Sequence, residues 1–552
     1  MKGLIIKNVS SLEKILPERK YRCKETNKGS CLINEEYSYQ IAYKAEEYYP
    51  MCLGGDGIFA RVHSDIADCI SVYKTRCVSV TRATYENPDD DYISTEACLI
   101  PDVLEPYEGC VGVTDSSYNS LWVSVKPGEN VKPGKHKIKV EFSFWNEVVG
   151  TSEFTLEVIG AVLPELDIPN TNWFHSDCIA TVHNCKVFSK EHWKLIDKYM
   201  KMAADHGVNM MLTPVITPAL DTKKGLERPT VQLVEISCEN GKYTFEFEKL
   251  GKWLELCRKN GIKYIEVAHL FTQWGGDNAP KILVRENGRS IKKFGWHTEA
   301  LSEEYTEFLK QFVPEVAKYL SENWDKDKIY FHLCDEPNEA HMEHYAKLYE
   351  VVKPLISGFR QMDALSSYEF YKKGCVDVPV VNTPHAHDFL GKDIPEVWIY
   401  TCCCPHNFGY SNRFLAMPSW RNRIIGLQMY KYGAKGFLHW GYNFYYSRLS
   451  INPINPYINN DAENAFPAGD GFGVYPVSGG CVPSIRYKVF YQGLQDIMAA
   501  KLLESLAGKE AVMEIAEENG KIDFNICPKN AEFILNVREK INKKIKECKA
   551  VE

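Results

Sequence analysis

Two adjacent carboxylic acids, Asp335 and Glu336, follow a short apolar run and have the types and spacing to do acid–base chemistry. The run 329–333 alternates large apolar residues, which predicts a strand, and Pro337 ends that strand because proline cannot donate to a ladder. An amphipathic pattern over 338–356 then predicts a helix. Paired acids can share proton transfer and charge stabilisation. The alternative is that they only cap the following helix.

Glycoside cleavage is one reaction that such a pair could perform. It needs a proton donor for the leaving oxygen and a group that stabilises the positive anomeric carbon. In barrel glycosidases that use two carboxylates, the second acid ends the seventh strand, but the strand predicted over 397–402 ends in Tyr-Thr-Cys without an acid. Two adjacent acids suggest another scheme, in which the 2-acetamido oxygen of the sugar attacks the anomeric carbon. Asp335 would orient the acetamide, and Glu336 would protonate the leaving oxygen and later activate water.

The elements around the pair predict a (β/α)8 barrel over 166–507. Amphipathic helices are predicted over 190–206, 248–260, 303–322, 422–432 and 484–506, a hairpin insertion over 230–247, and a long polar loop near Trp274. Strands are predicted over 172–180, 208–212, 262–270, 329–333, 359–365, 378–382, 397–402 and 436–441. The carboxyl ends of parallel barrel strands form the catalytic face, so we expect the acid pair on that rim.

The chain before and after the barrel predicts two further domains. Residues 1–165 contain short alternating runs, such as 136–142 and 151–159, separated by turns, which is typical of an antiparallel β-sandwich. Residues 508–552 predict a small C-terminal appendage with a basic helix over 531–549. The whole is a multidomain α/β protein.

Composition limits the classes of partner and compartment. The 552 residues carry a net charge of −8 without a basic stripe, which excludes a nucleic-acid partner. The absence of an 18-residue apolar run predicts no membrane span, and residues 1–7 do not resemble a secretion signal. The 19 cysteines are irregularly spaced without recurring Cys-x-x-Cys pairs, which favours free thiols in a cytoplasmic protein. We expect no cofactor and no metal, although His385 and His387 imitate the metal pair of barrel amidohydrolases.

The segment 172–506 resembles glycoside hydrolase family 123. The resemblance lies in Leu-Cys-Asp-Glu-Pro at 333–337, Val-Trp-Ile-Tyr-Thr-Cys at 397–402, Arg421, Gly-Phe-Leu-His-Trp at 436–440, Gly-Asp-Gly-Phe-Gly-Val-Tyr-Pro at 469–476 and Ser-Ile-Arg at 484–486. It departs at 491–496, where related sequences tend to carry Arg-Asp-Gly. The resemblance implies a sandwich followed by a barrel, and a retaining exo-β-N-acetylgalactosaminidase. Such an enzyme would remove terminal β-linked N-acetylgalactosamine from glycans or glycolipids through an oxazolinium intermediate.

Further residues are predicted to bind the sugar. Tyr400 would hydrogen-bond the acetamide oxygen, Trp440 would form a wall against the sugar, and Asp470 in its Gly-flanked loop would accept two sugar hydroxyls. Lesser candidates are Tyr475, Asn412, Asp177 and Trp274. For each of these residues the alternative is a packing or turn-forming role.

Two alternatives stay open at the level of function. One is a two-carboxylate retaining glycosidase that uses Glu336 with another acid, such as Asp461 or Asp470. The other is a non-catalytic carbohydrate-binding protein that keeps the barrel shape. The preference between galacto and gluco epimers, the formation of a homo-oligomer and the role of the sandwich are left undecided.

Overall fold

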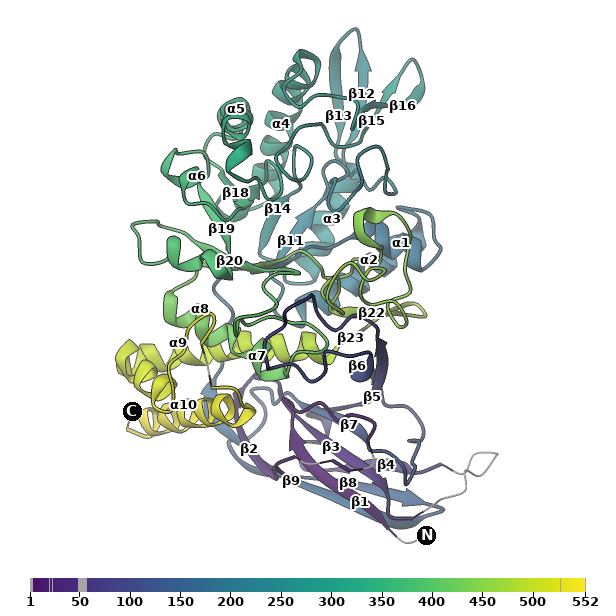
Figure 1. The fold of residues 1–552 in the computed structure, drawn as a ribbon, viewed down its shortest axis with the longest axis vertical. Helices are drawn as coiled ribbons and strands as arrows, with labels where there is room; N and C mark the ends of the chain where they lie inside the picture. The colour runs from purple at the N-terminus through teal and green to yellow at the C-terminus, as the bar shows by residue number, and fades with distance from the viewer. Residues whose placement is uncertain (1–2, 19, 22, 48–56, 527, 552) are drawn as a thin grey trace.

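The computed structural model describes residues 3–18, 20–21, 23–47, 57–526 and 528–551. The molecule is elongated, with the N-terminal sandwich at one end, the barrel in the middle and a small inserted sheet at the other end (Figure 1). Among the described residues, none of the helices combines the length and apolarity that crossing a lipid bilayer requires.

The sandwich consists of two sheets that face each other. The five-stranded sheet has the order β1 (Leu4–Ser10), β3 (Tyr37–Ala45), β7 (Asn119–Val125), β5 (Ile70–Val80) and β6 (Cys98–Pro106). The four-stranded sheet has the order β2 (Lys28–Ile33), β9 (Glu147–Val162), β8 (Gly134–Phe144) and β4 (Phe59–His63). Alternate apolar residues of both sheets, such as Ile41, Val123 and Phe142, form one core. All strand pairs are antiparallel except β2 with β9.

The barrel has eight parallel strands and is closed by pairing of its first and last members. They are β10 (Asn170–Asn172), β11 (Met210–Thr213), β14 (Tyr264–Val267), β17 (Ile329–Phe331), β18 (Arg360–Ala364), β19 (Val378–Asn382), β20 (Trp398–Thr401) and β21 (Gly436–His439). Large side chains fill its interior, among them Met362, Trp398 and Leu438. The fold class predicted from the sequence is therefore confirmed.

Helices surround the barrel and pack their apolar faces on its strands. They are α1 (Ser176–Val182), α2 (Lys190–Ala204), α3 (Glu248–Lys259), α4 (Glu303–Asn323), α5 (Met342–Val352), α6 (Glu369–Lys372), α7 (Ser419–Arg423), α8 (Ile425–Tyr432) and α9 (Ile485–Glu517). A hairpin with a two-residue turn, formed by β22 (Val474–Val477) and β23 (Gly480–Pro483), precedes α9. The short connections after β18 and β19 carry little helix, so this side of the barrel is more irregular.

One predicted strand is wrong in extent. The run 172–180 was expected to be a single strand, but β10 ends at Asn172 and α1 covers Ser176–Val182. The run mixes apolar residues with Asn172, His175, Ser176 and Asp177, and a short run of this kind has no clear period that would separate a strand from a helix. The difference changes the position of Asp177, which lies in α1 and not at the end of a barrel strand.

The segment predicted as a polar loop contains a second hairpin. Strands β15 (Ile282–Glu286) and β16 (Arg289–Phe294) pair with each other, and β15 also pairs with β12 (Glu235–Glu239) beside β13 (Lys242–Glu246). Asn287 and Gly288 both have positive φ, 49° and 73°, as the Asn-Gly hairpin turn requires. That dipeptide was the sequence signal for this hairpin.

The C-terminal segment connects the barrel to the sandwich. Helix α9 continues to Glu517 with a break at Gly508, whose φ is 85°, and α10 (Ala531–Val551) then packs against α9, β9 and β2. Figure 1 shows α9 and α10 side by side, between the barrel and the sandwich. The boundaries 1–165, 166–507 and 508–552 remain predictions, and the break at Gly508 lies close to the second of them.

Candidate active site

Asp335 and Glu336 lie beyond the carboxyl end of β17, the fourth barrel strand, and both line one pocket. Consecutive residues of an extended chain normally point to opposite sides. Here Glu336 has a φ of 45°, which breaks that alternation and lets both carboxyl groups face the same space. Positive φ is costly for a residue with a long side chain, especially before a proline, and such cost is concentrated at functional sites.

The pocket is small, about 120 Å³, and its walls are largely aromatic. Side chains from several barrel loops contribute, namely Trp173, His175, Leu220, Asp221, Trp274, Ala364, Tyr400, Cys402, Cys403, Leu438, Trp440, Phe444 and Phe466. Flat apolar rings with a few polar groups between them suit the faces and hydroxyls of a sugar ring. Three of the predicted contact residues, Tyr400, Trp440 and Trp274, belong to this wall.

Tyr400, in β20, donates a hydrogen bond from its Oη to Glu336 Oε1 at 2.7 Å. The phenol is buried, and burial raises the pKa of Tyr400 above its usual range, so the ring keeps its proton as a donor. Trp274 belongs to the loop after β14, and its backbone N–H donates to Asp335 O at 2.6 Å. Both acids are therefore attached to neighbouring elements of the rim.

The acid pair is electrostatically coupled. Burial, and then the adjacent Glu336 carboxylate, raises the pKa of Asp335 well above the usual range of an aspartate, while the His332 cation opposes that shift. Two carboxyl groups this close cannot both ionise without cost, so the pair retains a proton at pH values where an isolated aspartate has lost it. A shared proton is what acid–base catalysis requires of such a pair.

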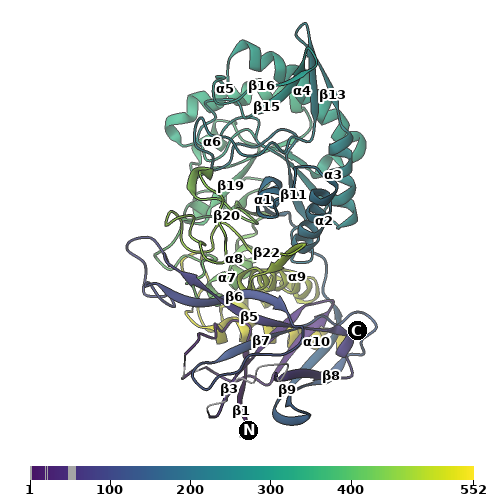
Figure 2. The same cartoon turned by 90° about the vertical axis from the view of Figure 1, so that its right-hand side faces the viewer.

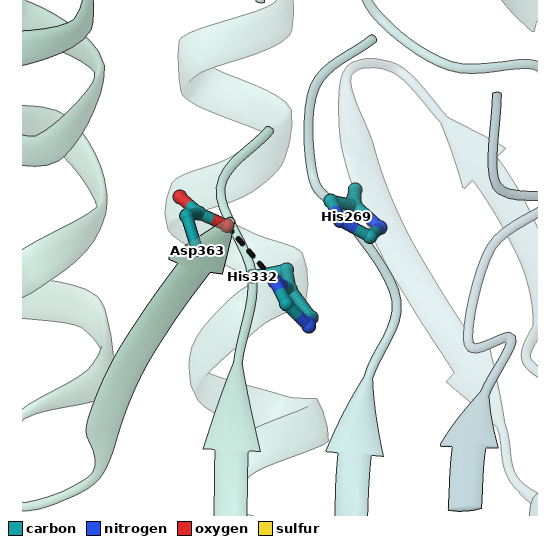
Figure 3. A group of neighbouring side chains, drawn as sticks. All are labelled: His269, His332 and Asp363. Carbon is teal, nitrogen blue, oxygen red and sulfur yellow. Dashed lines mark hydrogen bonds and ion pairs between the residues drawn. The ribbon is translucent and has the colours of Figure 1, made fainter. Parts of the chain in front are cut away.

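A buried charged cluster surrounds His332, three residues before Asp335, and Figure 3 shows His332 with Asp363 and His269. His332 Nδ1 lies 2.9 Å from Asp363 Oδ1, and Nε2 lies 2.7 Å from Glu266 Oε1. Burial alone would lower the pKa of His332, but its bonds to the two carboxylates raise it to about 9. At neutral pH the ring is therefore an imidazolium ion held between two anions.

The same cluster fixes the backbone that leads to the acid pair. Asp363 accepts hydrogen bonds from the backbone N–H groups of Leu333 and Cys334 at 3.1 and 3.4 Å, and from Tyr345 Oη at 2.7 Å. The strand ladder has ended here, so these backbone donors need another acceptor. Trp173 Nε1 also donates to Glu266 Oε1 at 2.7 Å, which attaches a pocket wall to the cluster.

His269, His332 and Asp363 also have metal-ligating atoms within 4.8 Å of one another. However, both nitrogens of His332 already bond carboxylates, and the His269 ring stacks on His332 with centroids 4.2 Å apart and planes 19° apart. Stacked rings direct their nitrogen lone pairs in parallel planes and cannot both point at one ion. The geometry fits a charge cluster better than a metal centre.

Trp440, at the end of β21, is held in the wall by Asp470. Its Nε1 donates to Asp470 Oδ2 at 2.8 Å, and its ring contacts the edges of Phe444 and Phe466. Asp470 is buried and does not line the pocket. The carboxylate that was expected to accept sugar hydroxyls instead orients the tryptophan, because the folded loop turns it behind the wall.

The remaining predicted contact residues lie outside the pocket. Asp177 forms a bidentate ion pair with Arg228. Asn412 donates to the carbonyls of Cys402 and Pro405 and so shapes the loop after β20. Tyr475 donates to Asp102 Oδ2 of the sandwich at 2.7 Å. In each case other parts of the protein satisfy the hydrogen bonds of a buried polar group, so these residues support the surrounding structure.

Asp221 and His175 line the pocket but were not predicted from the sequence. Asp221 accepts from Leu449 N at 2.9 Å, which leaves its other carboxylate oxygen without a protein partner among the described residues, and burial raises its pKa to about 6. His175 bonds Trp440 O through Nε2, and burial together with Arg228 lowers its pKa to about 3, so it is a neutral ring. Both follow strands whose loops have no regular pattern, so only their place on the barrel rim could have indicated them.

A larger hollow of about 620 Å³ lies at the opposite, amino end of the barrel. Its lining includes Tyr264, Lys328 and Glu396, which stand at the beginnings of strands or just before them. Barrel enzymes place chemistry at the carboxyl ends of their strands, so the smaller pocket with the acid pair is the candidate site.

Comparison with known proteins agrees with this geometry. Residues 173–503 match the family model described as "Glycoside hydrolase 123, catalytic domain". A structure of a family 123 glycoside hydrolase from Clostridium perfringens is similar with a TM-score of 0.72 and 16% identity, covering 99% of each chain. Its description concerns hydrolysis of glycolipid glycans by that enzyme.

Other structural matches have much lower TM-scores. A family 5 mannosidase from Rhizomucor miehei matches with a TM-score of 0.31 and 13% identity, covering 65% of this chain and 95% of its own. A family 5 xyloglucanase from Bacteroides ovatus matches with a TM-score of 0.28 and 8% identity, covering 86% of this chain and 99% of its own. Among curated proteins, none matches this sequence significantly. The family match spans more than half of the chain, and this protein therefore belongs to glycoside hydrolase family 123.

Proposed function

We propose that this glycoside hydrolase is a retaining exo-β-N-acetylgalactosaminidase that uses the acetamido group of its substrate as the nucleophile. The observation that supports this most is the convergence of Asp335 and Glu336 in one aromatic pocket, with Tyr400 bonded to Glu336. The end of β20 contributes Tyr400, Cys402 and Cys403 to the pocket and no acid, so the usual strand-seven nucleophile is replaced by the sugar.

The first step forms an oxazolinium ion. The acetamide oxygen attacks the anomeric carbon while the bond from that carbon to the leaving oxygen breaks, and Glu336 gives its proton to the leaving oxygen. With the shared proton of the pair on Glu336, the Asp335 carboxylate accepts a hydrogen bond from the acetamide N–H and offsets the positive charge that develops on the new ring. When the sugar binds, the Tyr400 hydroxyl turns from Glu336 and donates its one hydrogen bond to the acetamide oxygen, which it orients for attack.

The second step restores the enzyme. Water attacks the anomeric carbon, the bond to the acetamide oxygen breaks, and the Glu336 carboxylate takes the proton from that water. Two displacements at the same carbon return the original β configuration, so the product is β-N-acetylgalactosamine. The family 123 enzyme from Clostridium perfringens is described as acting on glycolipid glycans, and glycans or glycolipids with terminal β-linked N-acetylgalactosamine are the substrates proposed here.

A second mechanism is supported by Asp221, the third acid of the pocket. In that mechanism Asp221 attacks the anomeric carbon and forms a covalent glycosyl-enzyme, with Glu336 as acid and base. Asp461 and Asp470, the acids suggested by the sequence, are both buried outside the pocket. Asp461 accepts from Thr81 and Arg82, and Asp470 from Trp440. Burial raises the pKa of Asp221 to about 6, which still leaves most of this carboxyl group ionised at neutral pH, so the trapping experiment below decides between the two mechanisms.

The test is hydrolysis of a chromogenic β-N-acetylgalactosaminide together with inhibition by a thiazoline mimic of the oxazolinium ion. We expect turnover and strong inhibition. Turnover without inhibition at millimolar concentrations would reject participation of the acetamide, and a sugar trapped on Asp221 would establish the second mechanism. If the folded protein binds N-acetylgalactosamine but cleaves no glycoside, it is a carbohydrate-binding protein.

The acid pair is tested by substitution. Asp335→Ala and Glu336→Ala are each expected to lower kcat by about 10³-fold or more, because each removes a group that acts in the transition state. Glu336→Ala should recover on substrates with good leaving groups, which need no proton, whereas Asp335→Ala should not. Glu303→Ala, an exposed acid at the start of α4, is the control and should retain wild-type rates. Full turnover by Asp335→Ala would refute the assigned roles.

A further inference from the structure

The sandwich reaches the barrel through its edge strand β6. Val103 of β6 forms a backbone bridge with Ser484, the residue that caps α9, and Figure 2 shows β6 between the remaining sandwich strands and the barrel helices. The neighbouring residue Asp102 is completely buried. A carboxylate is rarely buried in this way unless a cation or several donors compensate it.

Arg486 in the first turn of α9 is that cation. Its Nε lies 3.1 Å from both oxygens of Asp102, and its Nη2 lies 3.0 Å from Oδ2. Tyr475 Oη adds a bond of 2.7 Å to the same carboxylate. The amino end of a helix disfavours positive charge, and Arg486 is also buried. The negative charge of Asp102 compensates both effects.

The remaining donors of the Arg486 guanidinium bind the backbone of the loop 469–472. Arg486 donates to Gly469 O at 2.6 Å and to Phe472 O at 3.0 Å, one bond at each end of the segment 469–472. Gly469 has a φ of 85°, and a Cβ there would lie 2.7 Å from the guanidinium carbon. The loop and the arginine therefore pack without space for even a methyl group.

The held loop supports the pocket wall. Asp470, within the segment, accepts from Trp440 Nε1 at 2.8 Å, and a Cβ on Gly441 would lie 2.6 Å from the Gly471 backbone. Phe444 N also donates to Gly471 O at 2.9 Å. We therefore expect a displacement of the loop to displace Trp440, since Asp470 binds its indole N–H and the adjacent Gly441 packs directly on the Gly471 backbone.

We propose that Asp102 is a positioning residue for the sugar pocket, so that the sandwich domain sets the place of Trp440 through Arg486 and the loop 469–472. Among the described residues, Asp102 is hydrogen-bonded to Arg486 and Tyr475, neither of which lines the pocket, so it acts through three contacts in series. This placement of Trp440 stands without the proposed function, while its kinetic consequence rests on the pocket being the sugar site.

The direct test observes Trp440 itself. Tryptophan is replaced biosynthetically by 5-fluorotryptophan in the full chain, and Trp440→Phe identifies the fluorine resonance of that ring. Asp102→Asn, which removes the charge opposite Arg486, is expected to shift or broaden this resonance. Glu36→Gln is the matched control, because Glu36 also joins the sandwich to α9 through a buried ion pair, with Lys488, but does not contact the loop. It should leave the resonance unchanged.

A kinetic test accompanies the spectrum. Asp102→Asn should raise KM for the chromogenic substrate about tenfold with little change in kcat, because an apolar wall binds substrate and transition state alike. In the Trp440→Phe background, Asp102→Asn should cause no further rise in KM, since both substitutions act through the Trp440 ring. If the wild-type protein cleaves no such substrate, the proposed function fails while the fluorine result still decides this proposal.

Two results would overturn the proposal. One is an unmoved Trp440 resonance in folded Asp102→Asn, and the other is an equal movement in Glu36→Gln, which would mean general loosening of the interface. If Asp102→Asn does not fold, Arg486→Lys replaces it, because lysine keeps the charge opposite Asp102 but cannot hold two carbonyls and a carboxylate in one plane. An unmoved resonance in that variant would equally reject the proposal.

Discussion

At the scale of single residues, the backbone angle at Glu336 decides what the acid pair can do. An extended chain would send one of the two side chains away from the pocket, and the φ of 45° brings both to it. Strain of this kind persists only where surrounding contacts impose it. Here the bonds from Tyr400 to Glu336 and from Trp274 to the Asp335 carbonyl are such contacts.

The Tyr400 hydroxyl should contribute measurably to catalysis. Tyr400→Phe removes one hydrogen bond to a charged group, which corresponds to a loss of about 10–100-fold in kcat/KM with the chromogenic substrate. Tyr330→Phe is a matched control, because Tyr330 Oη bonds Glu396 at 2.9 Å at the other end of the barrel. Equal activity of Tyr400→Phe and the wild type would exclude a role for this hydroxyl.

Asp221 separates the two proposed mechanisms. If its free oxygen binds a sugar hydroxyl, Asp221→Asn should lower kcat/KM by about 10–100-fold and change the preference between N-acetylgalactosaminides and N-acetylglucosaminides. If Asp221 is the nucleophile, the loss should be about 10⁴-fold or more with either epimer. Steady-state kinetics on both epimers, with circular dichroism to verify folding, distinguish these outcomes. A variant with unchanged rates and preference would remove Asp221 from the site.

At the scale of elements, the end of β17 is held by charge after its ladder has ended. The strand has only three residues, and the next backbone donors bond Asp363, which is itself bonded to His332. Glu266 of β14 completes the cluster from the adjacent strand. The barrel rim below the acid pair is therefore tied to neighbouring strands by three buried charges.

This cluster predicts how stability depends on pH. The pKa of His332 is about 9 when folded and about 6.5 in an unfolded chain, so the folded state binds its proton more tightly. The resulting stabilisation, on the order of 3 kcal/mol, is fully present below pH 6.5 and is lost as the pH rises through 9. Urea unfolding from pH 6 to 9 should show that the gap between the wild type and His332→Gln narrows with rising pH. A gap that stays constant would mean that the ring does not titrate in this range.

At the scale of the whole molecule, α10 joins the sandwich to the barrel. Arg538 of α10 is buried and pairs with Glu35 of the sandwich and with Asp496 of α9. Glu539 and Asn542 on the same helix bond Ser30 of β2. The C-terminal segment is thus a structural link between the two large domains.

Removing the ion pair between α10 and the sandwich should lower the stability of the protein. Arg538→Ala leaves the buried Glu35 without its cation, which is expected to lower the free energy of unfolding by about 3–5 kcal/mol. Lys546→Ala removes an exposed ion pair with Glu157 from the same helix and should cost no more than about 1 kcal/mol. Urea unfolding followed by tryptophan fluorescence compares the two variants. Similar midpoints for both would show that α10 contributes little to the junction.

The amino-acid sequence by itself determined the architecture and the place of the acid pair. Runs rich in apolar residues marked seven of the eight barrel strands, because a parallel strand that is buried on both faces must be largely apolar, whereas β10 is the polar run Asn170–Asn172. Pro337 after Asp335 and Glu336 placed the pair at the end of β17, since proline cannot continue a strand. Two local predictions were wrong. The run 172–180 was predicted as one strand, and the hairpin that Asn287-Gly288 indicates was predicted as a loop.

Only the tertiary structure decided which polar residues face the pocket. Asp470 and Asp221 both lie in irregular loops, and the flanking glycines made Asp470 the stronger candidate, yet Asp470 turns behind Trp440 and Asp221 turns inward. Their directions depend on partners such as Arg486 and Leu449, which are distant along the chain or on another strand's loop. Local patterns record burial and backbone preference, whereas the direction of a loop side chain is set by contacts that exist only after the chain has folded.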